Sequence, residues 1–101
     1  MKSKNIKTAT YPKISIIILN YNGKRWIKKC LPTIKKIKYK PIEVIIVNNG
    51  STDDSAKFLA KNYPDLRVIE IKKNRGYAGG NNLGVKNAKG EYLFILNPDV
   101  I

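Results

Sequence analysis

The feature that most constrains the fold is a run of apolar, mostly β-branched residues near the N-terminus, Lys13–Asn20, which reads KISIIILN. β-Branched residues favour strands, and a run with little polar alternation is typical of a strand covered on both faces. The run is much shorter than the ~20 apolar residues that cross a bilayer as a helix. We therefore expect a buried strand in a parallel sheet, with helices on both sides.

Three more strand-like segments follow, and segments with a helical pattern separate them. The predicted strands are residues 42–47 (IEVIIV), 67–71 (RVIEI) and 92–96 (YLFIL); the predicted helices are residues 24–38, a segment that begins after Thr52, and about two turns that end at Ala88. This alternation predicts an α/β fold, with a Rossmann-like, open and mostly parallel four-stranded sheet. We assign residues 1–11 to a flexible basic tail and residues 12–101 to one small domain.

Local signals refine the predicted helices and the connections between them. Pro32 lies inside the first helical pattern and is expected to kink that helix or to split it. Ser51 or Thr52 is expected to cap the second helix. Residues 72–80 contain several glycines and are expected to form a loop before the third helix.

The formal net charge is +13. A Lys-rich solvated surface is the simplest explanation, and a site for polyphosphate ligands near an anionic membrane is the alternative. Between Lys24 and Lys40 there are eight Lys or Arg residues and no acidic residue, so we expect weak contact between this helix and an anionic membrane. Nucleic acid is not expected as a partner, because no aromatic-studded strand or nucleic-acid motif accompanies the lysines.

Other compositional features limit the chemistry and the location. The chain has one cysteine, Cys30, and no histidine, which excludes an internal disulfide and a Cys/His metal cluster. A metal ion would therefore have oxygen ligands, which suggests Mg²⁺ or Mn²⁺. The basic N-terminus is not followed by an apolar signal core, so we expect a cytoplasmic protein, peripheral to the inner face of the membrane.

Polar and glycine-rich residues follow every predicted strand. These segments are residues 20–22, 48–51, 74–80 and 97–99. In open α/β sheets, ligands bind at the carboxyl ends of the strands. One such loop is ordinary turn chemistry, but four of them predict a binding site. The glycines do not have the G-x-G-x-x-G spacing, and no Walker A motif occurs, so neither dinucleotide nor P-loop binding is indicated.

The same segments carry a family resemblance. Residues 15–22 (SIIILNYN), 47–55 (VNNGSTDDS), 74–76 (NRG), 79–84 (GGNNLG) and 96–100 (LNPDV) resemble consecutive motifs of the family-2 glycosyltransferases, which are inverting enzymes of the GT-A fold. The resemblance extends from about Lys13 to the last residue. It implies the strand order 3-2-1-4, a nucleoside-diphosphate-sugar donor, and a hexosyltransferase-like activity of which this chain is the N-terminal, donor-binding half.

The resemblance also implies roles for individual residues. Tyr21 is expected to stack on the nucleotide base, and Leu19 and Asn20 to contact it through backbone groups. The family usually has an Asp after the second strand that accepts a hydrogen bond from the base; this chain has Asn48, whose amide oxygen can accept the same bond. The residues assigned to the nucleotide are Leu19, Asn20, Tyr21, Asn48, Asn49 and Gly76.

The family's D-x-D motif corresponds to Asn97-Pro98-Asp99. By resemblance, Asp99 holds the Mg²⁺ or Mn²⁺ that neutralises the donor diphosphate, and Asn97 contacts the ribose or the donor sugar. The family's catalytic base and acceptor region follow this motif, whereas the sequence ends at Ile101. No catalytic residue is therefore assigned, and the isolated chain is expected to be inactive.

Alternative functions remain open. The chain is either the donor-binding part of an enzyme or a non-catalytic nucleotide-sugar-binding module or subunit that a partner chain completes. A nucleotidyltransferase-like domain is less favoured, because the first strand lacks a following Gly/Arg/Lys-rich phosphate loop. The fourth strand, residues 92–96, has no charged residue. It is expected to form a sheet edge that pairs in a homodimer or with a partner chain.

Overall fold

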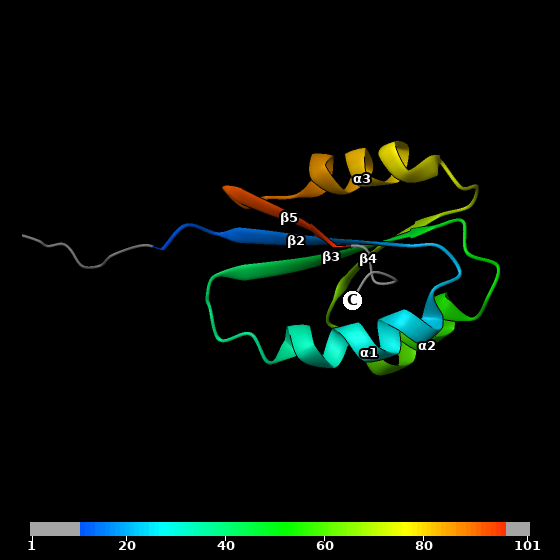
Figure 1. The fold of residues 1–101 in the computed structure, drawn as a ribbon, viewed down its shortest axis with the longest axis horizontal. Coiled ribbons are helices and arrows are strands. Elements are labelled where there is room, and N and C mark those ends of the chain that lie inside the picture. The colour runs from blue at the N-terminus through cyan, green and yellow to red at the C-terminus, as the bar shows by residue number, and fades with distance from the viewer. Residues whose placement is uncertain (1–10, 97–101) are drawn as a thin grey trace, which may run out of the picture.

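Four parallel strands form the centre of the computed structural model, which describes residues 11–96 (Figure 1). The strands are β2 (Ile14–Asn20), β3 (Ile42–Asn49), β4 (Arg67–Ile71) and β5 (Tyr92–Leu96). Their order is β4-β3-β2-β5, which confirms the predicted order 3-2-1-4. The two longest strands, β2 and β3, therefore lie in the middle of the sheet, where both faces are covered.

Helices α1 (Lys24–Lys35) and α2 (Ser55–Asn62) cover one face of the sheet, and α3 (Gly76–Asn87) covers the other (Figure 1). Successive residues of a strand point to opposite faces. Accordingly, Ile16 and Ile18 pack with Ile27 on the α1 side, and Ile17 packs with Val47 on the α3 side. The predicted helices on both faces are confirmed. No helix in residues 11–96 combines the length and the apolar character needed to cross a bilayer.

Helix α1 is shorter than predicted and is not split. It ends at Lys35 and not at Lys38, because the following N–H groups turn back by three residues: Lys36 N–H donates to Thr33 O at 3.1 Å, and Ile37 N–H donates to Ile34 O at 3.0 Å. Such bonds tighten the last turn of a helix. Pro32 lies within one continuous helix, on its exposed side.

The expected loop at residues 72–80 is also partly wrong, because α3 already begins at Gly76. Glycine disfavours helix by about 1 kcal/mol relative to Ala, which explains the loop prediction. Here the glycines bring the helix backbone close to the sheet. A Cβ on Gly84 would lie 2.6 Å from Ile17 Cγ2, and a Cβ on Gly80 would overlap Leu19. Close packing of α3 against β2 and β3 thus offsets the low helix propensity.

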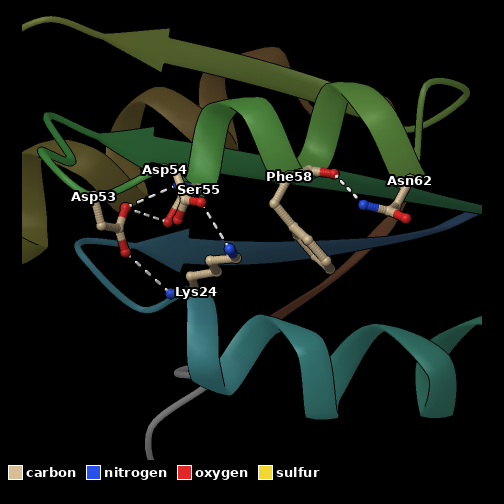
Figure 2. Close-up of polar contacts among 6 residues, drawn as sticks. All are labelled: Lys24, Asp53, Asp54, Ser55, Phe58 and Asn62. Carbon is tan, nitrogen blue, oxygen red and sulfur yellow. Dashed lines mark hydrogen bonds and ion pairs between the residues drawn. The ribbon is translucent and has the colours of Figure 1, made fainter.

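The start of α2 is held by Asp53 and not by Ser51 or Thr52 (Figure 2). One carboxylate oxygen of Asp53 accepts hydrogen bonds from the Ser55 N–H at 3.0 Å and from the Ser55 hydroxyl. The other oxygen accepts a hydrogen bond from the Lys24 N–H at 3.3 Å. One negative charge therefore lies at the positive ends of both α2 and α1.

These contacts affect the titration of Asp53. Burial raises the pKa of this carboxyl, but the hydrogen bonds from Ser55 and Lys24 outweigh burial and hold the pKa below its ordinary value of 3.8. Because the folded-state pKa is depressed, the charged carboxylate stabilises the fold above pH 3.8, and the contribution is lost as the pH falls through the folded-state value.

We predict that Asp53→Ala lowers the free energy of unfolding by about 1 kcal/mol at pH 7, the usual effect of removing a helix-capping side chain. The difference from the wild type should shrink at pH 3, which is below the ordinary pKa of 3.8, because protonation of Asp53 in the unfolded chain then offsets the gain from the charged carboxylate. Urea unfolding at both pH values measures it. Asp54→Ala is the control: Asp54 forms only an exposed ion pair with Lys24, so its loss should matter less. Equal losses in the two variants would contradict the role of Asp53.

Candidate functional site

Polar side chains gather where β2, β3 and β4 end. Because the strands are parallel, their carboxyl ends lie at the same edge of the sheet. The register pairs Asn20 with Asn48 and Asn48 with Glu70, so these residues occupy neighbouring positions on three adjacent strands. We call them the Asn20–Asn48–Glu70 row.

The row is joined by side-chain hydrogen bonds. Asn20 Nδ2 donates to Asn48 Oδ1 at 2.9 Å, and Asn48 Nδ2 donates to Glu70 Oε1 at 2.9 Å. Asn20 and Asn48 are 1% and 2% exposed. Burying an amide is unfavourable unless its donors and acceptor are satisfied, and each amide here has partners for both kinds of group. The row therefore fixes the ends of three strands relative to one another.

A second set of hydrogen bonds connects the loop after β2 to the loop after β3. Asn22 has φ of 52°, a left-handed conformation that Asn tolerates better than most residues. Its Oδ1 accepts hydrogen bonds from the N–H groups of Thr52 at 2.6 Å and Asp53 at 3.1 Å. Its own N–H donates to Ser51 Oγ at 3.0 Å. The two loops thus hold each other in place.

Tyr21 lies between Asn20 and Asn22, whose side chains are both engaged in these contacts. Its own side chain is 53% exposed. Leu19, one residue before Asn20, is half-buried and packs against the α3-side core. The structure therefore holds the backbone on both sides of Tyr21 while leaving its ring accessible to a ligand.

Asn49, also at the end of β3, faces the opposite side of the sheet and fixes the approach to α3. Its Nδ2 donates to Asn74 Oδ1 at 3.2 Å and to Gly76 O at 3.1 Å, and its Oδ1 accepts a bond from Arg75 N–H at 3.0 Å. Gly76 has φ of +78°, and a Cβ placed there would meet nothing within 4 Å. The first residue of α3 therefore faces open space.

Asn48 is placed differently from what its expected role requires. Besides the bond from Asn20, its Oδ1 accepts a hydrogen bond from the Ser51 hydroxyl, so both lone pairs of the oxygen are used. A base could be read by Asn48 only by replacing one of these partners. Base recognition by Asn48 stays a prediction.

Two residues of this network were not assigned from the sequence. Ser51 Oγ contacts Asn20, Asn22 and Asn48, and Glu70 ends the row. The sequence alone assigns no role to Glu70. Its position in the otherwise apolar segment 68–71, one strand away from Asn48, is the signal that points to it.

The expected metal and sugar ligands, Asp99 and Asn97, lie outside the described residues. Within residues 11–96, no group of three or more His, Cys, Asp or Glu side chains is arranged to hold a metal ion. A hollow of about 620 Å³ adjoins the loop after β2 at the start of α1. Four basic residues and two carboxylates contribute to its lining: Lys24, Arg25, Lys28, Lys29, Asp53 and Asp54.

Comparison with known sequences places the chain in a family. Residues 15–101 match the model described as glycosyl transferase family 2. An uncharacterised glycosyltransferase of Rickettsia typhi is 39% identical over 95 residues, which cover 93% of this chain and 30% of that protein. Glycosyltransferase GlyA of Streptococcus pneumoniae is 34% identical over 90 residues, which cover 86% of this chain and 13% of that protein. The chain thus spans less than a third of these relatives.

Solved structures show the same arrangement. A mannosyltransferase from Pyrobaculum calidifontis, in complex with GDP-Man and Mn²⁺, superposes with a TM-score of 0.76 at 29% identity, over 90% of this chain and 28% of that one. Residues 1–349 of S. aureus TarS, in complex with UDP-GlcNAc, give a TM-score of 0.77 at 27% identity, over 86% of this chain and 26% of that one. The chain belongs to glycosyl transferase family 2, and its sheet and helices have the GT-A fold.

Proposed function

We propose that this chain binds the nucleoside-diphosphate-sugar donor of an inverting glycosyltransferase, together with Mg²⁺ or Mn²⁺. The observation that supports this most is the edge of the sheet where the Asn20–Asn48–Glu70 row fixes three strand ends beside the exposed ring of Tyr21. Two related structures carry GDP-Man with Mn²⁺ and UDP-GlcNAc. We extend the same class of donor to this chain.

In this proposal the nucleotide lies against the loop after β2. Tyr21 stacks on the base, and the backbone of Leu19 and Asn20 supplies hydrogen-bonding groups. The open approach at Gly76 leaves room for the ligand on the α3 side, and Asn49 contributes by fixing that segment. Asn48 lies at the same edge. It either accepts a hydrogen bond from the base or supports the site indirectly, by fixing the strand ends in the Asn20–Asn48–Glu70 row.

We predict that Tyr21→Ala weakens binding of UDP or GDP about tenfold or more, because stacking of an aromatic side chain on a base is worth ~1–3 kcal/mol. Isothermal titration calorimetry measures the change. Tyr92→Ala is a matched control, since Tyr92 is 57% exposed but lies at the amino end of β5, opposite Ile14. If the two variants bind equally well, Tyr21 does not stack on the base.

The metal in this proposal is held by Asp99, and Asn97 contacts the ribose or the donor sugar. Donor phosphates and water would complete the coordination, as is common for Mg²⁺. The bound cation supplies positive charge that stabilises the diphosphate leaving group.

We predict that UDP or GDP raises the melting temperature more with Mn²⁺ than with EDTA, because only the metal-linked ligand binds tightly to the folded chain. Asp99→Asn should remove the difference. Differential scanning fluorimetry measures both effects, and Asp65→Asn, an exposed carboxylate that pairs with Lys35, serves as the control. An equal shift with Mn²⁺ and EDTA in the wild type would argue against a metal at Asp99.

We assign no catalytic base. Five of the described carboxylates accept hydrogen bonds within the chain: Glu43, Asp53, Asp54, Asp65 and Glu70. The sixth, Glu91, lies just before the amino end of β5, away from the carboxyl edge of the sheet. Donor binding is therefore the part of the transfer reaction that we assign to residues 11–96.

We also propose that β5 pairs with a second copy or with another chain. β5 lies at the edge of the sheet, and its residues 92–95 are 42–57% exposed although all four are apolar or aromatic. A strand of a parallel sheet is normally covered on both faces. An uncovered apolar edge favours pairing with another strand.

We predict that the wild type self-associates or aggregates as its concentration rises, because β5 pairing buries the exposed apolar strand. Phe94→Lys should keep the chain monomeric, since Phe94 is 55% exposed and a charge there opposes pairing. Light scattering across a concentration series measures the mass. Val85→Lys, an exposed apolar residue on α3, is the control. A wild type that stays monomeric throughout would show that β5 does not mediate self-association.

A further inference from the structure

Helix α1 and helix α2 form the layer that covers one face of the sheet (Figure 1). From Lys24 to Lys40 the chain carries eight basic residues and no acidic one. The structure divides them into two groups, according to whether they contact α2 and the segment after it or point away from them.

The first group lies on the side of α1 that faces α2. Lys24 Nζ forms an ion pair with Asp54 at 2.7 Å, and Lys35 Nζ forms one with Asp65 at 3.3 Å. Lys28 Nζ lies 6.0 Å from the centre of the Phe58 ring of α2. These contacts connect α1 to α2 and to the segment that follows α2, and the charges of Lys24 and Lys35 are each paired with a carboxylate.

The second group points away from α2. At 100° per residue, Arg25, Lys29 and Lys36 form one column along the helix. All three are exposed, and none forms an ion pair within the part of the chain that the structure describes. The exposed Lys38 and Lys40 extend the column beyond the helix end. We call these five residues the outer basic surface.

Apolar groups adjoin this surface. The half-buried ring of Trp26 lies beneath Arg25 and Lys29, whose cationic groups are 4.7 and 5.4 Å from its centre. Ile37 is 40% exposed beside Lys36 and Lys38. A surface that combines unpaired basic side chains with partly exposed aromatic and aliphatic groups is the composition that settles at the headgroup region of a bilayer.

We propose that the outer basic surface docks the protein on an anionic membrane. Arg25 and Lys29 also line the hollow at the start of α1, together with Asp53 and Asp54, but Lys36, Lys38 and Lys40 lie beyond that hollow. The surface as a whole is therefore extended along the helix, which suits a charged plane better than one small anion. Single-stranded nucleic acid is bound on platforms of exposed aromatic rings, whereas Trp26 is half-buried under its own cations. Each basic residue near an anionic bilayer strengthens binding about fivefold, so five of them produce stable but salt-sensitive attachment.

Membrane docking also has a consequence for the acceptor substrate. This consequence rests on the proposed donor-binding function. Helix α1 begins directly after the loop that contains Tyr21. A membrane bound along α1 therefore lies next to the donor site, and the acceptor class that this arrangement suits is one anchored in the bilayer surface.

The experiment is co-sedimentation of the full chain with vesicles of phosphatidylcholine alone or phosphatidylcholine with phosphatidylserine, at low and high salt. We expect binding only to the anionic vesicles and a steep loss with salt. Lys29→Gln/Lys36→Gln should weaken binding about twenty-fivefold, that is, about fivefold per residue. The control, Lys86→Gln/Lys89→Gln, removes the same charge from exposed residues of α3 and the following loop, beyond the other face of the sheet, and should change binding little.

Equal loss in the two double variants, or equal binding to neutral vesicles, would overturn the proposal. The proposal would also be overturned if soluble glycerol phosphate displaced the protein from the vesicles more than chloride does at equal ionic strength, because that result would indicate a headgroup pocket. Tighter binding to an RNA oligonucleotide than to the vesicles would overturn it as well. The melting-temperature shift with UDP and Mn²⁺, measured on the same samples, separates this proposal from the proposed function, because Lys29→Gln/Lys36→Gln should leave that shift intact.

Discussion

The structure depends on the hydrogen bond between Asn20 and Asn48, because it allows polar groups to be buried where two central strands end. An amide in that position without a partner would destabilise the fold by about 1–3 kcal/mol. Glu70 and Ser51 satisfy the remaining polar groups of Asn48. The loops that follow these strands therefore begin at fixed positions. Tyr21 can lie in such a loop with its ring exposed while the neighbouring backbone stays in place.

Much of the fold could be predicted from the sequence, because the strongest signals were also the ones that determine packing. The apolar runs of β2 and β3 can be covered only in the middle of a parallel sheet, and there they lie. The start of α3 could not be predicted by the same reasoning. Helix propensity treats Gly80 and Gly84 as breakers, whereas contact with Leu19 and Ile17 makes glycine the residue that fits. Propensity is local, and this contact joins residues more than sixty positions apart.

The gathering of polar residues at one edge of the sheet could be predicted, but the hydrogen bonds among them could not. Polar residues at the strand ends identified the edge of the sheet, and Tyr21 is exposed there. The occupation of Asn48 by internal partners could not be read from the sequence, because it depends on the register that sets Asn48 beside both Asn20 and Glu70. The helix start at Asp53 was missed for a similar reason: its carboxylate is shared with the Lys24 N–H, a partner remote in sequence.

The glycines of α3 have a consequence for how the molecule can vary. Because Gly80 and Gly84 have no side chains, the helix backbone packs directly against the side chains of Leu19 and Ile17, and this contact sets the distance between α3 and the sheet. A bulkier residue at Gly84 would push α3 away from the sheet at that point. The helix would then tilt, and its first residue, Gly76, would be displaced as well. A packing change two turns away would thereby shift the start of α3, where the proposed ligand approach lies. If the proposed function holds, the spacing between α3 and the sheet and the shape of the binding site change together, so substitutions in this part of the core should alter ligand preference.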